Sequence, residues 1–129
     1  MSHSKEFEAL VDDAKSRIVE CTIDDVLARQ KRGEKLRLID TREDDEWRAG
    51  HVAGAEHIGR GVIERDITAK VPNKEEELIL YCGGGFRSAL AADALQKMGY
   101  TNVWSVAGGW RGWQAAGLPV ESGAPDGST

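Results

Sequence analysis

The chain has 129 residues, of which 40% are hydrophobic and 30% are charged, and its formal net charge is -5. This size and composition fit one globular domain with a core of its own. The acidic balance argues against nonspecific nucleic-acid binding, and no apolar run approaches the roughly 18 residues of a membrane helix. The polar N-terminal stretch MSHSKEFEALVDD does not have the character of a secretory signal, so a cytoplasmic location is expected.

The first third of the chain predicts alternating helices and strands. Apolar residues at helical spacing predict an amphipathic helix over 5–18, which packs on its own domain or on a partner. Thr22 has the character of an N-cap, with acidic residues in the first turn after it. The other elements expected here are a strand over 18–21, a helix over 22–32 that ends at Gly33, and a strand over 36–40 that stops at Asp40.

The rest of the chain continues this alternation. The run ELILYC, residues 77–82, is apolar without alternation, which indicates a strand buried on both faces. The tail 121–129 has the composition of a flexible segment. The other expected elements are an acidic helix over 43–50, a loop over 51–59 with a brief extended piece near Ile58, a helix over 62–67, a helix from Phe86 that ends at Gly99, a strand over 102–108 and a short helix over 109–117.

Strands that alternate with helices predict an α/β fold with a parallel, doubly wound sheet. Residues 1–19 are interpreted as a helical extension, 20–120 as the domain and 121–129 as the tail. In such sheets the ligand lies beyond the carboxyl ends of the strands. Asp40 and Cys82 both occupy such ends, which places them at the functional edge.

Cys82 begins the most informative stretch, CGGGFR. A glycine-rich loop between a strand and a helix can direct its N–H groups inward, and the helix N-terminus adds a partial positive charge. A thiolate beside such a loop is stabilised, and Arg87 can add a fixed cation. The alternative is a buried structural cysteine followed by a turn. The coincidence of strand, cysteine, three glycines, arginine and helix favours a nucleophile.

Two stretches of the sequence resemble the single-domain rhodanese family. LILYCGGGFRSALAADALQKMGYTNVWSVAGGWRGWQAAGLPV resembles its C-terminal half, and LIDTREDDEWRAGHVAGAEHI resembles its other signature. The resemblance covers about residues 20–120. It implies a rhodanese-like α/β fold, with a central parallel sheet that has helices on both faces.

The resemblance also implies a sulfurtransferase that needs no metal and no organic cofactor. Cys82 is then the catalytic nucleophile and takes the outer sulfur of thiosulfate or of a persulfide donor. A thiol, cyanide or a protein then accepts that sulfur from the Cys82 persulfide. The persulfide is held by the substrate-binding loop, which consists of Gly83, Gly84, Gly85, Phe86 and Arg87. The acidic charge balance and the lack of a long apolar run lead us to expect no nucleic-acid or membrane partner, and the protein is expected to be a monomer or weak dimer.

Three further residues are expected to support the site. Asp40 and Arg42 match the family's Asp-x-Arg pair and are expected to brace the active loop rather than take part in the chemistry. Arg60 is either a residue of the pocket mouth or a surface arginine. His51 is expected to be a structural histidine, and nothing near His51 and His57 completes a metal site.

Several alternatives stay open beside the sulfurtransferase. Cysteine phosphatases need five residues between cysteine and arginine, whereas Cys82 and Arg87 enclose four. Many relatives that use thiosulfate have a basic or polar residue where Gly83 stands, so the loop carries a single cation and thiosulfate is expected to bind weakly. A binding module, or a sulfur relay that acts only on a partner, would share the same loop. Cys21 is a resolving thiol or, by preference, a small apolar residue of the first strand.

Overall fold

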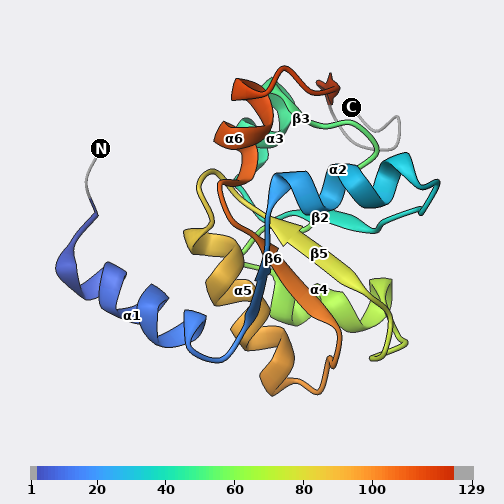
Figure 1. Ribbon diagram of the computed structural model, residues 1–129. Coiled ribbons are helices and arrows are strands. Elements are labelled where there is room, and N and C mark those ends of the chain that lie inside the picture. The colour runs from blue at the N-terminus through green and yellow to red at the C-terminus, as the bar shows by residue number, and fades with distance from the viewer. Residues whose placement is uncertain (1–2, 124–129) are drawn as a thin grey trace.

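A parallel sheet of five strands, in the order β1-β6-β5-β2-β4, forms the centre of the protein (Figure 1). The structure is a computed structural model that describes residues 3–123. Each neighbouring pair of strands is parallel, which confirms the predicted fold class. The strands are β1 (Val19–Cys21), β2 (Leu38–Asp40), β4 (Glu56–His57), β5 (Leu78–Tyr81) and β6 (Val103–Val106).

Helices cover both faces of this sheet and create two hydrophobic clusters. One cluster contains Ile63 and Leu95, which come from two of the helices. The other cluster contains Val26 and Trp113, which come from two other helices. α1 packs on α5, on the side away from α2 and α6 (Figure 1). The helices are α1 (Lys5–Lys15), α2 (Ile23–Lys31), α3 (Asp44–Ala49), α4 (Ile63–Lys70), α5 (Phe86–Lys97) and α6 (Gly109–Ala115).

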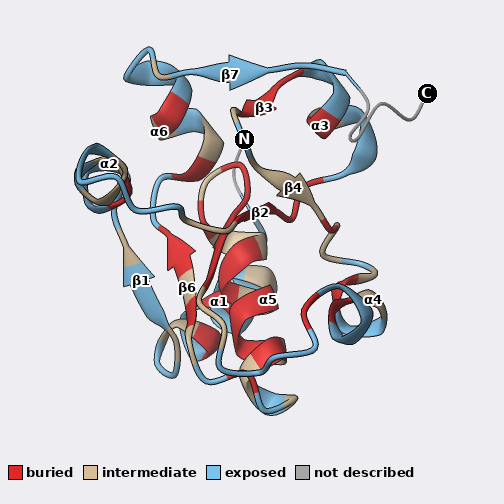
Figure 2. Ribbon diagram, turned by 90° about the vertical axis from the view of Figure 1, so that its right-hand side faces the viewer, coloured by how far each residue is buried: buried red, intermediate tan, exposed pale blue. Residues whose placement is uncertain are grey.

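The central strand β5 explains why its sequence lacks alternation. Leu78 and Leu80 belong to the cluster under α4 and α5, whereas Ile79 and Tyr81 belong to the cluster under α2 and α6. All four side chains are buried, so both faces of the strand are apolar. Figure 2 shows the same pattern along β6, while the edge strand β1 is largely exposed. The predicted burial on both faces is therefore confirmed.

A small second sheet was missed by the sequence analysis. β3 (His51–Val52) pairs antiparallel with β7 (Val120–Glu121), and the predicted loop over 51–59 contains both β3 and β4. Strands of two residues have no periodicity that a sequence pattern can detect. The expected flexible tail begins at Glu121, which forms part of β7, whereas residues 124–129 of that tail lie outside the described residues.

The helix α1 packs against its own domain. Ser4 caps its N-terminus by accepting a hydrogen bond from the Phe7 N–H at 3.0 Å, and Val11 and Ala14 are buried. Arg17, just after α1, binds both carboxylate oxygens of Asp93 on α5 at 2.9 Å. Of the helices in residues 3–123, none combines the length and the apolar character that a membrane crossing requires.

Candidate active site

Cys82 lies directly after β5, where the chain turns through three glycines into α5. Its side chain is only 1% exposed. Gly85 is the N-cap of α5, and its φ of 104° lies in the left-handed region that glycine adopts without strain. Because a glycine has no side chain, the first turn of α5 has no side-chain cap. The N-terminal amides of this helix therefore remain available to another acceptor.

Two donors point at the sulfur of Cys82. The N–H of Gly85 donates to Cys82 Sγ at 3.2 Å, and the hydroxyl of Ser88 lies 3.5 Å from the same atom. Ser88 is itself held by a 2.8 Å hydrogen bond to the hydroxyl of Ser105 on β6. Donors of this kind stabilise a negative sulfur, because a thiolate accepts hydrogen bonds better than a thiol does.

The loop is also held from outside by α6. The carbonyls of Cys82 and Gly83 accept hydrogen bonds from the N–H groups of Trp110 at 2.7 Å and Arg111 at 3.0 Å. Those carbonyls would otherwise be the acceptors for the first amides of α5. Within residues 3–123, the N–H groups of Gly83, Gly84, Phe86 and Arg87 have no hydrogen-bond acceptor. The loop thus combines a fixed backbone with unused donors, as an anion site requires.

Two arginines lie at this loop, and their electrostatic situations differ. Arg87 forms a double hydrogen bond with Glu46 of α3, at 2.6 and 3.1 Å, and this guanidinium holds the pKa of Glu46 below its usual value. Arg111 of α6 is exposed, and no carboxylate among the described residues lies within ion-pair distance of it. A β-carbon added at Gly84 would lie 3.0 Å from Arg111 Nη1, so this guanidinium rests against the loop. Within residues 3–123, the positive charge of Arg111 is therefore uncompensated.

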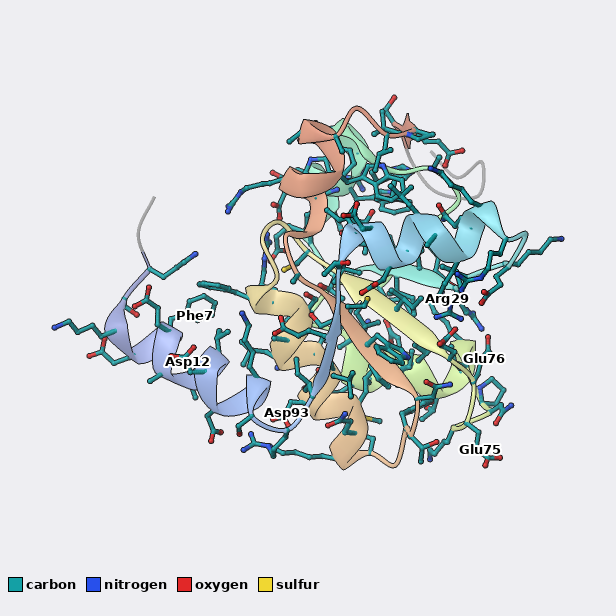
Figure 3. All side chains as sticks on the ribbon, viewed as in Figure 1. Phe7, Asp12, Arg29, Glu75, Glu76 and Asp93 are labelled. Carbon is teal, nitrogen blue, oxygen red and sulfur yellow. The ribbon has the colours of Figure 1, made fainter. Side chains whose placement is uncertain are left out.

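A pocket of about 250 Å³ opens above this loop. Cys82, Gly84 and Phe86 belong to its wall, together with both arginines. The remaining wall comes from His3 and Phe7, at the N-terminal end of α1. Figure 3 shows Phe7 on the side of α1 that faces the beginning of α5. The pocket thus joins the Cys82 thiol, two cations and an aromatic surface.

Asp40 and Arg42 form a buried ion pair beside the site. Arg42 Nη2 lies 2.8 Å from Asp40 Oδ2 and donates to the carbonyl of Gly50 at 2.6 Å. The guanidinium of Arg42 also lies 4.7 Å from the ring centroid of Trp110, the residue whose N–H binds the Cys82 carbonyl. The pair thus contacts the α6 turn that holds the loop, and it does not line the pocket.

The structure does not bring Arg60 into the pocket. Its guanidinium binds Glu64 at 2.8 Å in α4, and its backbone N–H donates to the carbonyl of Thr41. His51 Nδ1 lies 2.8 Å from the carbonyl of Trp47, and the two rings stack 3.3 Å apart. No cluster of three or more metal-ligating side chains occurs among residues 3–123.

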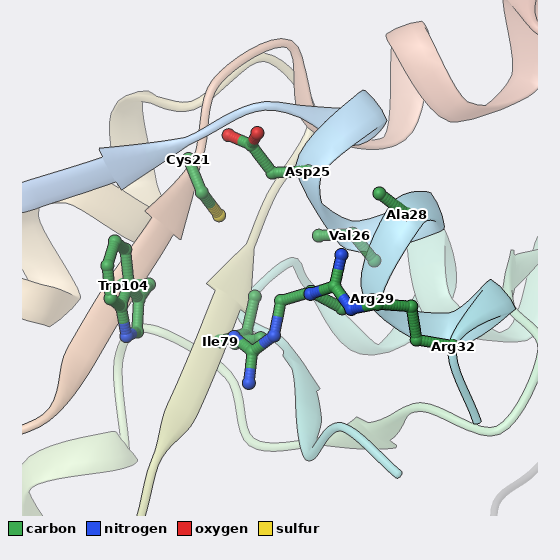
Figure 4. A pocket seen from close by; sticks show the side chains of 8 residues that line it. All are labelled: Cys21, Asp25, Val26, Ala28, Arg29, Arg32, Ile79 and Trp104. Atoms are coloured by element: carbon green, nitrogen blue, oxygen red, sulfur yellow. The ribbon is translucent and has the colours of Figure 1, made fainter. Parts of the chain in front are cut away.

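Cys21 lies in a separate pocket of about 260 Å³ at the end of β1 (Figure 4). The wall of this pocket includes Asp25 and Arg29 of α2 and Trp104 of β6. Burial, reinforced by the Asp25 carboxylate, raises the pKa of the Cys21 thiol to about 11. Such a thiol carries little thiolate at neutral pH, which agrees with a packing role rather than a resolving one.

Five residues of this site were not predicted from the sequence: His3, Phe7, Glu46, Ser88 and Arg111. Arg111 corrects the expectation of a single cation, because it brings a second guanidinium to the loop from another element. One signal could have identified it. The stretch GGWRGW follows the predicted strand over 102–108, so it lies at the same carboxyl edge of the sheet as Cys82.

Comparisons with known proteins agree with this geometry. The Rhodanese-like domain family matches residues 22–116. A putative mitochondrial thiosulfate sulfurtransferase of Schizosaccharomyces pombe is 31% identical over 99 residues, which cover 67% of this chain and 70% of that protein. The putative sulfur carrier protein YrkF of Bacillus subtilis is 32% identical over 98 residues, which cover 76% of this chain. That match spans only 52% of the length of YrkF.

A solved structure extends the likeness to almost the whole chain. It is a protein of unknown function from Rhodopseudomonas palustris, described as a possible tyrosine phosphatase. Its TM-score is 0.79 at 33% identity, and the alignment covers 94% of this chain and 98% of that one. The matched residues 22–116 contain the Cys82 loop, the Asp40–Arg42 pair and α6. The chain belongs to the Rhodanese-like domain family.

Proposed function

We propose that this protein is a sulfurtransferase that carries a sulfane sulfur as a persulfide on Cys82. The donor is thiosulfate or a persulfide, and the acceptor is cyanide, a thiol or a protein. The observation that carries the proposal is the surroundings of Cys82 Sγ, which accepts a hydrogen bond from Gly85 N–H at the uncapped end of α5. Relatives named as a thiosulfate sulfurtransferase and as a sulfur carrier support the same activity.

The first half-reaction loads the sulfur. Cys82 gives its proton to water, and its thiolate attacks the outer sulfur of thiosulfate. A new S–S bond forms on Cys82, the S–S bond of thiosulfate breaks, and sulfite leaves with the electron pair. The persulfide that remains carries one negative charge on its terminal sulfur. The unused N–H groups of Gly83, Gly84, Phe86 and Arg87 are the donors that we assign to that charge.

The second half-reaction returns the enzyme to its starting state. The acceptor attacks the terminal sulfur of the persulfide, and the Cys82 thiolate leaves. Ser88 assists both halves by donating to Cys82 Sγ whenever that atom is negative. In this proposal Asp40 and Arg42 brace the loop through Trp110, and Arg60 supports the fold rather than the chemistry.

Intact mass measurement tests the proposal directly. After incubation with thiosulfate and removal of excess reagent, the protein should gain one sulfur, about 32 Da, which a thiol then removes. Cys82→Ser should abolish both this gain and the transfer of sulfur to cyanide. Cys21→Ser is the matched control and should keep both. A mass gain that persists in Cys82→Ser would contradict the assignment.

A phosphatase is the second candidate, because the Rhodopseudomonas palustris protein is described as a possible one. Four residues lie between Cys82 and Arg87, so the ring of amides suits one sulfur atom better than a phosphoryl group with three outer oxygens. The guanidinium of Arg87 also forms an ion pair with Glu46. We expect no hydrolysis of an aryl phosphate. If the protein hydrolyses it and takes up no sulfur from thiosulfate or a persulfide, the second candidate is correct.

A further inference from the structure

The helix α1 lies before the residues that match the family, yet it completes the pocket above Cys82. His3 and Phe7 approach Phe86 of the active loop, with ring centroids 4.7 and 5.8 Å away. The rings of His3 and Phe7 are also in contact, at 5.1 Å. These three rings form one continuous aromatic surface beside the nucleophile. We call them the aromatic wall.

The aromatic wall has a fixed position because α1 is anchored to α5. Val11 is almost completely buried and lies one turn after Phe7 on the same face of the helix. Arg17 binds both carboxylate oxygens of Asp93, and neither residue lines the pocket. Figure 3 shows Asp93 well apart from Phe7. A substrate therefore meets a surface that is already in place, and binding does not have to order it.

The same pocket contains the guanidinium of Arg111. Glu46 neutralises Arg87, whereas Arg111 has no carboxylate partner among the described residues. The pocket of about 250 Å³ also exceeds what thiosulfate needs, since an apolar cavity of about 150 Å³ can hold benzene. Size, apolar surface and charge together suit an organic anion better than a small inorganic one.

We propose that the sulfur donor of this protein is an organic sulfane-sulfur anion with an apolar or aromatic group, and that Phe7 and His3 select it. The proposal rests on the proposed sulfur transfer through Cys82. In the loading step the thiolate attacks the sulfane sulfur of R–SO₂–S⁻, and a persulfide forms on Cys82. The bond between the two donor sulfurs breaks, and the sulfinate R–SO₂⁻ leaves with the electron pair. Phe7 contacts R, and Arg111 binds the anionic head.

A pair of donors with identical reacting groups tests this selection. Benzenethiosulfonate and methanethiosulfonate carry the same charge and differ in R, so the ratio of their kcat/KM values reports on the aromatic wall. Phe7→Ala should lower the ratio of kcat/KM for benzenethiosulfonate to kcat/KM for methanethiosulfonate about tenfold, mainly by raising KM for the aromatic donor. Turnover of methanethiosulfonate and thiosulfate should fall less than that of benzenethiosulfonate, because neither of these two donors carries an aromatic group that can contact Phe7.

Leu10→Ala is the matched control, because Leu10 lies on the same helix, is 60% exposed and is absent from the pocket. It should leave the ratio unchanged. Arg111→Gln should lower kcat/KM for all three donors and leave the ratio unchanged. Phe7→Leu keeps an apolar contact with α5, so it should lower the ratio about threefold even if Phe7→Ala loosens α1.

The outcomes separate the two proposals. If no donor adds sulfur to Cys82, the proposed function is wrong, and so is the donor selectivity that rests on it. If all three donors add sulfur and the ratio in Phe7→Ala and Phe7→Leu equals that of the wild type, the sulfur transfer holds and the aromatic wall has no part in selecting the donor.

Discussion

Both cysteines of this protein lie at the carboxyl ends of parallel strands in one sheet, and their surroundings are opposite. Cys21 is the last residue of the edge strand β1, and Cys82 follows the central strand β5. Each is followed by a helix, α2 after Cys21 and α5 after Cys82. The position in the sheet is therefore not what separates a candidate nucleophile from a structural thiol.

The beginning of the following helix makes the difference. Thr22 and Asp25 form a capping box at α2, in which each side chain accepts a hydrogen bond from the backbone N–H of the other residue. The cap of α5 is Gly85, which has no side chain, and its N–H donates to Cys82 Sγ. In α2 the chain satisfies its own amides, whereas in α5 the amides are left to the sulfur.

The charges nearby reinforce this difference. The carboxylate of Asp25 faces Cys21 and opposes a negative sulfur there, in addition to the effect of burial. Around Cys82 the pocket contains two guanidiniums, and that of Arg111 has no carboxylate partner in the part of the chain that the structure describes. A strand-end thiol thus becomes a candidate nucleophile when the next helix leaves its amides free and the neighbouring charges are positive.

The largest expected effect concerns the reactivity of Cys21. Burial raises the pKa of its thiol from 9.0 to about 11, so its thiolate fraction at pH 7.5 should be roughly a hundredfold below that of an unperturbed thiol. In the Cys82→Ser variant, the rate of alkylation by iodoacetamide should rise about tenfold for each pH unit between 7 and 9. The same variant in urea provides the unperturbed reference. A plateau of the folded rate below pH 9 would overturn the contrast between the two thiols.

The second expected effect concerns the contact between α6 and the active loop. Gly109 has a φ of 48°, and a β-carbon at this position would collide with the carbonyl of Cys82. Gly109→Ala should therefore lower sulfur transfer at least about tenfold and destabilise the fold by about 2 kcal/mol. Urea unfolding and the transfer of sulfur to cyanide measure the two effects.

Gly33→Ala is the control for Gly109→Ala. Gly33 also has a left-handed φ, of 87°, but a β-carbon there would have no atom within 4 Å. This variant should lose about 1 kcal/mol of stability with unchanged sulfur transfer. Equal activity losses in the two variants would mean that the approach of α6 to the Cys82 carbonyl is not what shapes the site.

The smallest expected effect isolates one charge at Cys21. Asp25→Asn removes the carboxylate but keeps an oxygen that can accept the Thr22 N–H, so the cap of α2 should survive. The alkylation rate of Cys21 at pH 8 should rise two- to threefold, because burial, the larger cause of the raised pKa, remains. Asp24→Asn, one residue away and outside the pocket, should change nothing. A larger rise than about tenfold would make Asp25, rather than burial, the main cause.

The local pattern of the sequence was enough to predict the alternating elements, the doubly covered sheet and the position of Cys82. An apolar run without alternation predicts a strand between two layers, and β5 has apolar residues in both clusters. Glycines between a strand and a helix predict a loop whose N–H groups turn inward, and the N–H of Gly85 donates to Cys82 Sγ. Each of these features depends on residues that are close together in the sequence, so a short stretch is enough to predict it.

Only the tertiary structure decided which distant side chains share the site. Arg87 was expected to serve the loop, but its guanidinium is bound by Glu46, 41 positions earlier in the chain. Arg111 is the pocket cation without a carboxylate partner among residues 3–123, and Phe7 reaches the pocket from a helix outside the matched family region. Such contacts depend on how α1, α3 and α6 pack against α5 and the loop before it. The orientation of packed helices is set by many small contacts at once, and no short stretch of sequence specifies it.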